Sequence, residues 1–508
     1  MPEGCVPNVT CRVIFLRSAI LSEMFAQLRA QFTKLDLDLA TAFKIAVAIG
    51  LCICGGRFTQ SESRDLLQSP ANGENVALEL QRAAALIQSG HADEAEQALR
   101  HLLASNPKNA DAHNLIGVIM DQRGNSVEAE REYRAALSLN PRSISARANL
   151  GVLQARSGHS DAAIETFESV LRDAPDQPPA ILNLGLLYAA RGDYLRAAPY
   201  LEKARTQQPR NMTVLVQLGF TLYQLKRPDE AADVLAAANS LAPADANVLY
   251  LSGLVASLRG DAEAAVSFWQ RTLAQRPDLA AANFMIGEEL RKQRRYEGAV
   301  EFYQKALAQD PHQLVYHVRL GGTYMLMSRY DRAVEIFQQA AQRFPTSAEA
   351  QYFAGIGARG LGNFELAETA LRKSLALKDS NVDTLAQLGF VIEQRGLDAE
   401  AEKFLRRAIA VDPRHFYANY DLGRVLVHAK RYDEAIPVLK AAMQIRPQDA
   451  GVHYQMFIAY TRLKRTDDAD RELKLFKQYD AENKGRRGEG EEQIEDSLPR
   501  PPNSEKPD

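Results

Sequence analysis

The sequence predicts an all-α fold, a solenoid of antiparallel helix pairs arranged in tandem. Three observations lead to this prediction. The 508-residue chain repeats one pattern every 34 residues, each repeat holds two stretches with apolar residues three and four positions apart, and most repeats close at a proline. A repeat of this length accommodates two helices and their turns, and tandem repetition lets each pair bury its apolar faces against the next.

The composition excludes several classes of protein. The chain has 61 basic and 64 acidic residues, a net charge of -3, so nothing favours binding to nucleic acid, which requires clustered basic side chains. Its four cysteines, Cys5, Cys11, Cys52 and Cys54, all lie near the N-terminus. No disulfide framework and no cysteine-based zinc site can therefore hold the main body together. We expect no cofactor.

Residues 1–75 form the first zone, a leader and linker with one apolar run at residues 45–54 (IAVAIGLCIC). The run is too short for a hydrocarbon core of about 30 Å but suits the apolar region of a signal peptide or a short anchor, with Lys44 as its basic flank. Met24 is an alternative start to Met1 and would shorten the lead. We expect an exported or membrane-associated protein of a bacterial cell envelope or periplasm. The alternative is a peripheral helix of a cytoplasmic protein.

Residues 76–483 form the second zone, which twelve units of 34 residues fill without insertion. A glycine recurs at 34-residue spacing in ten of the units, at Gly117, Gly151, Gly185, Gly219, Gly253, Gly287, Gly321, Gly355, Gly389 and Gly423. An alanine follows each of them by twelve positions, and the first four of these are Ala129, Ala163, Ala197 and Ala231. Small side chains at matched positions indicate that two helices approach closely there.

The fourth unit illustrates the expected hairpin, with its first helix over about 179–190 and its second over about 195–207. Glycines such as Gly192 stand in the turn, where a positive φ can end the first helix. Proline after the second helix disfavours helical geometry in the preceding residue and so ends that helix. Large residues such as Phe167 and Tyr303 stand one turn beyond the alanine, and we expect them to fill the space between units. The third zone, residues 484–508, is charged and poor in apolar residues, so we expect a disordered tail.

The period, the small pair, the aromatic residue and the proline together resemble the tetratricopeptide repeat family over about four fifths of the chain. The resemblance implies a right-handed superhelix whose first helices line a concave groove for protein or peptide partners. Carried over by register, the groove residues are Asn149, Asn183, Leu186, Gln217, Phe220, Tyr223, Tyr250, Leu254, Phe284, Arg319, Tyr352, Phe390, Tyr420 and Tyr454. The chain lacks the lysine and asparagine pair with which some members bind chaperone tails.

Asn149, Asn183 and Gln217 occupy one equivalent position in three successive units. Side-chain amides can hydrogen-bond a peptide backbone whatever its sequence. The row is similar to an asparagine ladder in the repeat arm of O-linked N-acetylglucosamine transferases, although it breaks at Leu251.

No motif of the chain indicates catalysis. The G-x-G-x-x-G spelled by residues 355–360 falls within a predicted helix rather than between a strand and a helix, as a dinucleotide site requires. The nine histidines are scattered without metal-ligand spacing. We therefore expect a non-catalytic scaffold for protein–protein contacts. Two alternatives stay open, an envelope accessory subunit of polysaccharide synthesis or export, and a substrate-recognition arm related to the glycosyltransferases without their catalytic domain.

Overall fold

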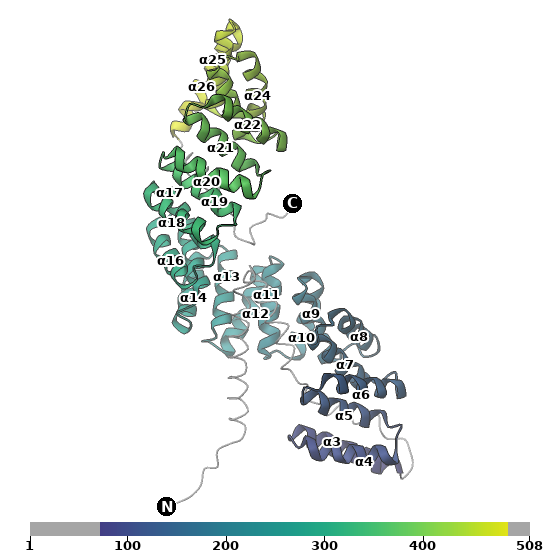
Figure 1. Cartoon of the computed structure of the whole chain (residues 1–508). Helices are drawn as coiled ribbons and strands as arrows, with labels where there is room; N and C mark the ends of the chain where they lie inside the picture. Colours follow the sequence, from purple (N-terminus) through teal and green to yellow (C-terminus); the bar gives the residue numbers. More distant parts are fainter. Residues whose placement is uncertain (1–71, 486–508) are drawn as a thin grey trace, which may run out of the picture. The chain divides into compact units, whose positions relative to one another are not determined.

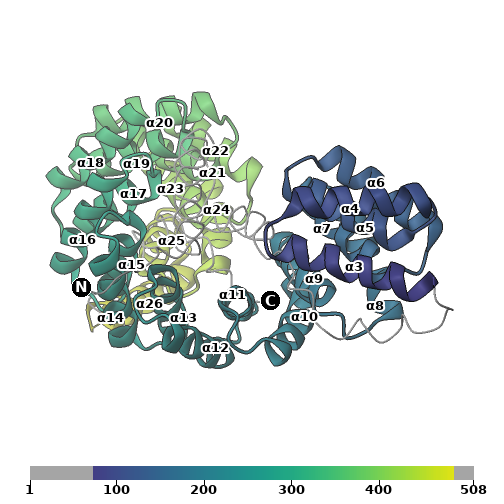
Figure 2. The same ribbon diagram turned by 90° about the horizontal axis from the view of Figure 1, so that it is seen from below.

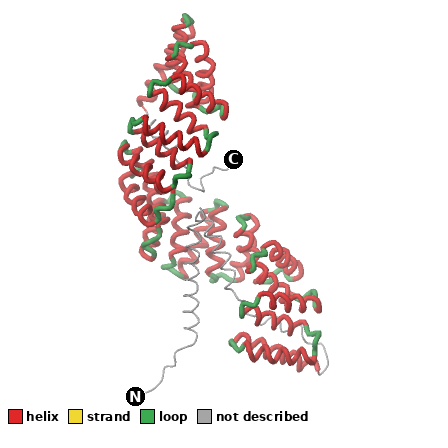
Figure 3. Tube along the Cα trace, in the orientation of Figure 1, coloured by secondary structure: helices red, strands yellow, loops and turns green. Residues whose placement is uncertain are grey.

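The computed structural model describes residues 72–485, and every regular element in that range is a helix (Figure 3). The predictions made for the apolar run at residues 45–54, for the alternative start at Met24 and for the tail from residue 486 onward lie outside the described residues. Contacts divide the chain into two units, one ending at Gln275 and the other beginning at Arg276. Each unit is described by itself.

The described part of unit 1, from Asn72 to Gln275, contains six helix pairs (Figure 1). The first members of the pairs, called A helices, are α3 Asn72–Gln88, α5 Ala110–Gln122, α7 Ile144–Arg156, α9 Pro178–Ala190, α11 Met212–Gln224 and α13 Ala246–Leu258. The second members, called B helices, are α4 Ala92–Ser105, α6 Ser126–Leu139, α8 Ser160–Asp173, α10 Tyr194–Gln207, α12 Pro228–Leu241 and α14 Ala262–Gln275.

Unit 2 contains six further pairs up to residue 485, where its described part ends. Its A helices are α15 Ala280–Lys292, α17 Leu314–Leu326, α19 Ala348–Gly360, α21 Val382–Gln394, α23 Phe416–His428 and α25 Ala450–Arg462. Its B helices are α16 Tyr296–Gln309, α18 Tyr330–Arg343, α20 Phe364–Leu377, α22 Asp398–Val411, α24 Tyr432–Ile445 and α26 Thr466–Gly485. From α5 to α25 the bounds repeat every 34 residues, which confirms the period, and the segment spelling G-x-G-x-x-G lies within α19 as expected.

The two kinds of helix form separate layers within each unit. Within each unit, every helix packs on its neighbours in sequence, and most A helices also contact the next A helix, as α9 contacts α11 and α21 contacts α23. Within the described residues, no B helix approaches the next B helix as closely. The A layer is therefore the more closely spaced, inner side of each unit. Figure 2 shows this order in unit 2, where α16 and α18 lie outside α15, α17 and α19.

Local chemistry sets the ends of the helices. Ser143, Asn211 and Asp449 are examples of polar residues that precede A helices and accept hydrogen bonds from the free N–H groups of the first turn. Each A helix then ends in a three-residue turn whose middle residue has positive φ. Among the described residues this position holds seven glycines, Gly192 being one, as the sequence predicted, and five other residues, such as Lys430 at φ 61°.

The repeat glycine lies beneath a large side chain of its own pair. A Cβ on Gly117 would lie 2.6 Å from the ring of Tyr133, and one on Gly151 would lie 2.8 Å from the ring of Phe167. The corresponding contacts of Gly185 and Gly219 are with Leu201 and Leu235. The large residue therefore packs within its own pair, directly over the glycine, whereas the sequence analysis placed it between units. The alanines Ala129, Ala163, Ala197 and Ala231 are each fully buried.

Candidate partner-binding surfaces

The inner layer of unit 1 carries the predicted amide row. Asn149 lies on α7 and donates through Nδ2 to Asn114 Oδ1 at 3.0 Å, so these two amides join adjacent A helices. Asn183 on α9 is half-buried and donates to the carbonyl of Pro179 at 2.8 Å within its own helix. Gln217 on α11 is buried, and its Oε1 has no hydrogen-bond partner among the described residues.

The unpaired amide of Gln217 is the least satisfied group of this row. Leaving a buried acceptor without a donor costs about 1–3 kcal/mol. The sixth residue of three successive A helices thus presents a side-chain amide, and one of the three is short of a donor.

Apolar and aromatic residues flank the amide row in unit 1. Leu186, Phe220 and Tyr223 are buried, whereas Tyr250 and Leu254 are half-buried. The ring of Phe220 meets Tyr194 of α10 edge to face, with centroids 5.9 Å apart. Lys226 Nζ lies 5.8 Å from the centre of the Tyr223 ring. Much of the predicted groove set in this unit therefore belongs to the packing of the A layer, and Tyr250 and Leu254 offer the more accessible apolar surface.

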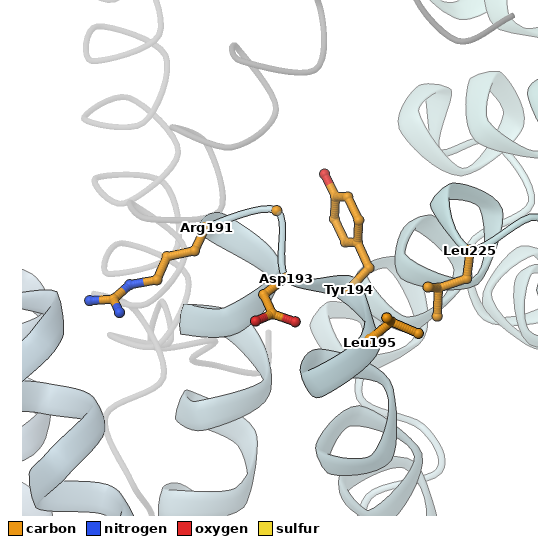
Figure 4. A pocket seen from close by; sticks show the side chains of 6 residues that line it. Arg191, Asp193, Tyr194, Leu195 and Leu225 are labelled. Carbon is orange, nitrogen blue, oxygen red and sulfur yellow. The ribbon is translucent and has the colours of Figure 1, made fainter. Parts of the chain in front are cut away.

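A hollow of about 370 Å³ lies where the α9–α10 turn meets the end of α11 (Figure 4). Its lining includes Tyr194 and Leu225, which Figure 4 shows beside each other, while Arg191 points away from them. Arg191 binds Asp161 at 2.6 Å, and Asp193 accepts from the backbone N–H of Arg196 as the cap of α10. Its charged residues thus have structural roles, and the hollow carries no arrangement suited to chemistry.

The inner layer of unit 2 begins with a buried ion pair. Arg319 of α17 and Glu288 of α15 have side chains 3% and 5% exposed, and Arg319 Nε lies 3.2 Å from Glu288 Oε1. The hydroxyl of Tyr303 donates to the same carboxylate oxygen. Burial, followed by the charge and hydrogen bond of Glu288, raises the pKa of Tyr303 well above its usual value. Phe284, also on α15, is buried and stacks on Tyr316 with centroids 4.8 Å apart.

Further along unit 2, two arginines flank one aromatic ring. The guanidinium carbons of Arg359 on α19 and Arg424 on α23 lie 5.5 Å and 5.2 Å from the centre of the Phe390 ring on α21. Arg359 donates to Gln387 Oε1 at 2.8 Å, and Arg424 also lies 5.8 Å from the ring centre of Tyr420. All five side chains are half-buried. We call these five residues the arginine–aromatic surface.

The two arginines have different charged partners. Arg424 donates to Glu393 and lies 3.6 Å from Asp421. Among the described residues, the contacts of Arg359 are with the neutral Gln387 and Phe390, and its charge acts on Asp421 only at longer range. The pKa of Asp421 is raised to about 7, because burial and the charge of Glu393 outweigh the opposing charges of Arg424, Arg359 and His415. Near neutral pH, the positive charge of the two arginines therefore exceeds the negative charge of Glu393 and the partly protonated Asp421.

The remaining predicted groove residues are Tyr352 and Tyr454, on α19 and α25. Tyr352 on α19 is half-buried and meets Phe353 edge to face at 5.4 Å. Tyr454 on α25 is 42% exposed and lies 5.1 Å from the ring of Phe476. The structure thus brings Phe390 and Tyr420 together with the arginines, whereas Phe284 and Arg319 belong to buried packing on other helices.

Sequence reasoning did not single out Arg359 or Glu393. Each is the twelfth residue of its A helix, the register that Tyr223 occupies in α11. In this register, a side chain reaches the sixth and ninth residues of the following A helix, as Arg359 reaches Gln387 and Phe390. Applying that register to every unit is the signal that would have found both residues.

No group of three or more histidine, cysteine, aspartate or glutamate side chains within residues 72–485 could hold a metal ion. None of the helices in the described part of the chain combines the length and the apolar character that crossing a membrane requires.

Comparison with family models identifies the repeats. One tetratricopeptide repeat model matches residues 80–143, and a second matches residues 122–185 and 188–255. The model of the C-terminal domain of cilia and flagella-associated protein 70 matches residues 260–495. No curated protein matched the chain in the sequence search.

Many solved structures resemble the chain at low overall similarity. Yeast Tom70 is 14% identical over 78% of this chain and 97% of its own, with a TM-score of 0.36. Cut9, in the Cut9–Hcn1 tetramer of the APC/C, is 16% identical over 84% of this chain and 90% of its own, with a TM-score of 0.38. MamA is 26% identical over 34% of this chain and 93% of its own, with a TM-score of 0.30.

Proposed function

Because the chain belongs to the tetratricopeptide repeat family, we propose that it is a scaffold that binds extended segments of partner proteins along the A layer of its units. A tandem repeat fold of this kind is typical of protein–protein interaction scaffolds, which are generally non-catalytic. The proposal assigns the protein no catalytic step. Its partners are proteins or peptides.

The observation that carries the proposal is the amide row of unit 1. Asn149, Asn183 and Gln217 recur at one register on successive A helices, and the side chains of Asn149 and Asn183 are half-buried, so they are accessible to a bound segment. An extended segment presents backbone N–H and C=O groups at regular intervals, and side-chain amides can hydrogen-bond these groups without regard to the side chains of the segment. The half-buried Tyr250 and Leu254 nearby add apolar area that a bound segment can cover.

Peptide display on the full-length protein tests the proposal. Peptides selected on the wild type are remeasured with Asn183→Leu, which removes a half-buried amide at similar size, and with Tyr250→Ala. Leu195→Ala is the matched control, because Leu195 is 78% exposed on the B helix α10. We expect both A-layer variants to weaken binding and the control to leave it unchanged. Equal binding by all three variants would refute recognition on the A layer.

Two finer assignments rest on the sequence alone. The apolar run at residues 45–54 supports a role as an accessory subunit in a bacterial envelope, and fractionation of cells expressing the tagged full chain tests it. A product confined to the cytoplasm would remove this proposal. The partial amide row supports a glycosyltransferase-related arm, which predicts binding of the peptide substrates of such an enzyme.

A further inference from the structure

Arg359 differs from the other arginines of unit 2 that take part in the inner-layer contacts described above. Its guanidinium lies against the Phe390 ring. Gln387 Oε1 accepts a hydrogen bond from this guanidinium at 2.8 Å and so holds one edge of it in place. Both partners are neutral, so the positive charge of Arg359 is oriented but not neutralised by a contact. Arg319 and Arg424, by contrast, each lie beside buried carboxylates.

A guanidinium whose orientation is fixed in this way is well placed to bind a planar anion. The guanidinium fork matches the geometry of a carboxylate, and an arginine already ordered by stacking loses less conformational freedom on binding. Because Arg359 is half-buried, a bound carboxylate would be partly shielded from water, which strengthens the attraction. The half-buried Tyr352 on the same helix and Tyr420 on α23 supply aromatic surface.

Charge complementarity decides the kind of partner. The surface has one cation whose contacts are neutral, Arg359, and a second, Arg424, whose carboxylates Glu393 and Asp421 are buried beside it. A basic segment would meet Arg359 as a like charge, and a neutral one would leave it unpaired. An acidic segment gains an ion pair there.

We propose that the arginine–aromatic surface of α19, α21 and α23 binds an acidic segment of a partner protein, with a glutamate or aspartate carboxylate on Arg359. This inference rests on the proposed scaffold function and names the partner chemistry of one surface in unit 2. In this proposal, the amide row of unit 1 binds the backbone of a partner segment, whereas the arginine–aromatic surface selects the charge of its side chains.

The test uses two fluorescein-labelled peptides and the full-length protein. One probe alternates glutamate and glycine over eight residues, and its twin carries glutamine in place of glutamate. Fluorescence anisotropy at low ionic strength should show at least about tenfold tighter binding of the glutamate probe. Added salt should weaken that binding, because it screens the charge on this half-buried site.

Variants locate the site. Arg359→Gln should weaken the glutamate probe about tenfold or more and leave the glutamine twin unchanged. Arg407→Gln is the matched control: Arg407 also lies over a phenylalanine ring, Phe404, at 5.9 Å, but it is an exposed residue of the B helix α22. Equal losses in the two variants, or equal affinity for the two probes, would overturn the proposal.

A second measurement covers the case in which Arg359→Gln disturbs folding. A glutamate probe with a benzophenone group is photo-crosslinked to the wild-type protein, and the attachment sites are mapped by mass spectrometry. Crosslinks on α19, α21 and α23 support the proposal, and crosslinks confined to other helices refute it. If only neutral peptides bind, and Tyr250→Ala abolishes their binding, the scaffold function stands and this inference alone fails.

Discussion

His453 and Glu472 form a buried pair that joins the last two helices of unit 2. His453 Nδ1 lies 2.6 Å from Glu472 Oε2, and His453 Nε2 lies 2.8 Å from the carbonyl oxygen of Pro447. Both ring nitrogens therefore face acceptors. Only the protonated imidazole can donate from both nitrogens, so the geometry requires a charged ring in a site where both side chains are less than one tenth exposed.

This pair predicts that the docking of α26 weakens as pH rises. Burial alone would lower the pKa of His453, but the hydrogen bonds to Glu472 and Pro447 outweigh it and raise the pKa. A raised folded pKa gives stability that is fully present below about pH 6.5, the unfolded value, and is lost as pH rises through the folded pKa. Hydrogen exchange of α26, corrected for its intrinsic pH dependence, should show protection falling above that pH.

His317 provides a matched comparison with the opposite sign. It occupies the same register of α17, but it packs edge to face on Phe344, and burial lowers its pKa. The stability that neutral His317 contributes to the fold should therefore begin to fall as pH drops below about 6.5. His453→Gln should remove the loss of protection at high pH in α26, and His317→Gln should leave that loss intact. A pH profile of α26 that is unchanged by His453→Gln would contradict the pairing.

The repeat glycine predicts opposite effects of one substitution at two helical sites. A Cβ on Gly287 would lie 2.7 Å from ring carbons of Tyr303, which is fully buried, whereas a Cβ on Gly298 meets only Leu290 Cδ1 at 3.2 Å. Gly287→Ala should destabilise unit 2 by about 1–2 kcal/mol, because overpacking exceeds the gain of about 1 kcal/mol in helix propensity. Gly298→Ala should be neutral or stabilising. Urea unfolding measures both, and a stabilising Gly287→Ala would contradict the packing.

Helix bounds followed closely from the sequence because the residues that end helices are visible in it. The fourth pair was expected at residues 179–190 and 195–207 and lies at Pro178–Ala190 and Tyr194–Gln207. The turns at Ser328 and Lys430 were harder to predict from the sequence, because these residues adopt positive φ although neither is glycine. There the surrounding helices impose the turn, and no local residue type marks it.

The candidate surfaces were only partly predictable, because register does not determine exposure. Phe220 and Phe390 occupy the ninth position of their A helices, yet Phe220 is buried and Phe390 is half-buried. The difference depends on the size and charge of residues on adjacent helices, about 28–31 positions away, as with Arg359 and its partners Gln387 and Phe390. Pairings at that separation require the three-dimensional register of two helices, which one sequence shows only through its period.

Lys430 predicts a stabilising substitution. Its φ of 61° is unfavourable for a residue with a Cβ, at a turn position that glycine occupies in seven other pairs of the described chain. Lys430→Gly should raise the stability of the α23–α24 region by about 0.5–1 kcal/mol, the relief of strain being partly offset by the greater freedom of glycine in the unfolded chain. Lys430→Val should lower it. Hydrogen exchange of α23 and α24 measures the stability change in both variants. A destabilising Lys430→Gly would show that the lysine side chain itself stabilises the fold.

The buried pair of Arg319 and Glu288 predicts a loss of stability that a second substitution repairs. Arg319→Met leaves the Glu288 carboxylate buried with Tyr303 as donor and with Arg291 Nε 3.7 Å away, and it should cost about 3–5 kcal/mol. Adding Glu288→Leu removes the stranded charge and should restore most of the stability, since methionine and leucine occupy the equivalent positions at Met285 and Leu254. Hydrogen exchange of α15–α17 in the two single variants and the double variant gives the coupling energy. Additive losses would show that the two side chains do not act as a pair.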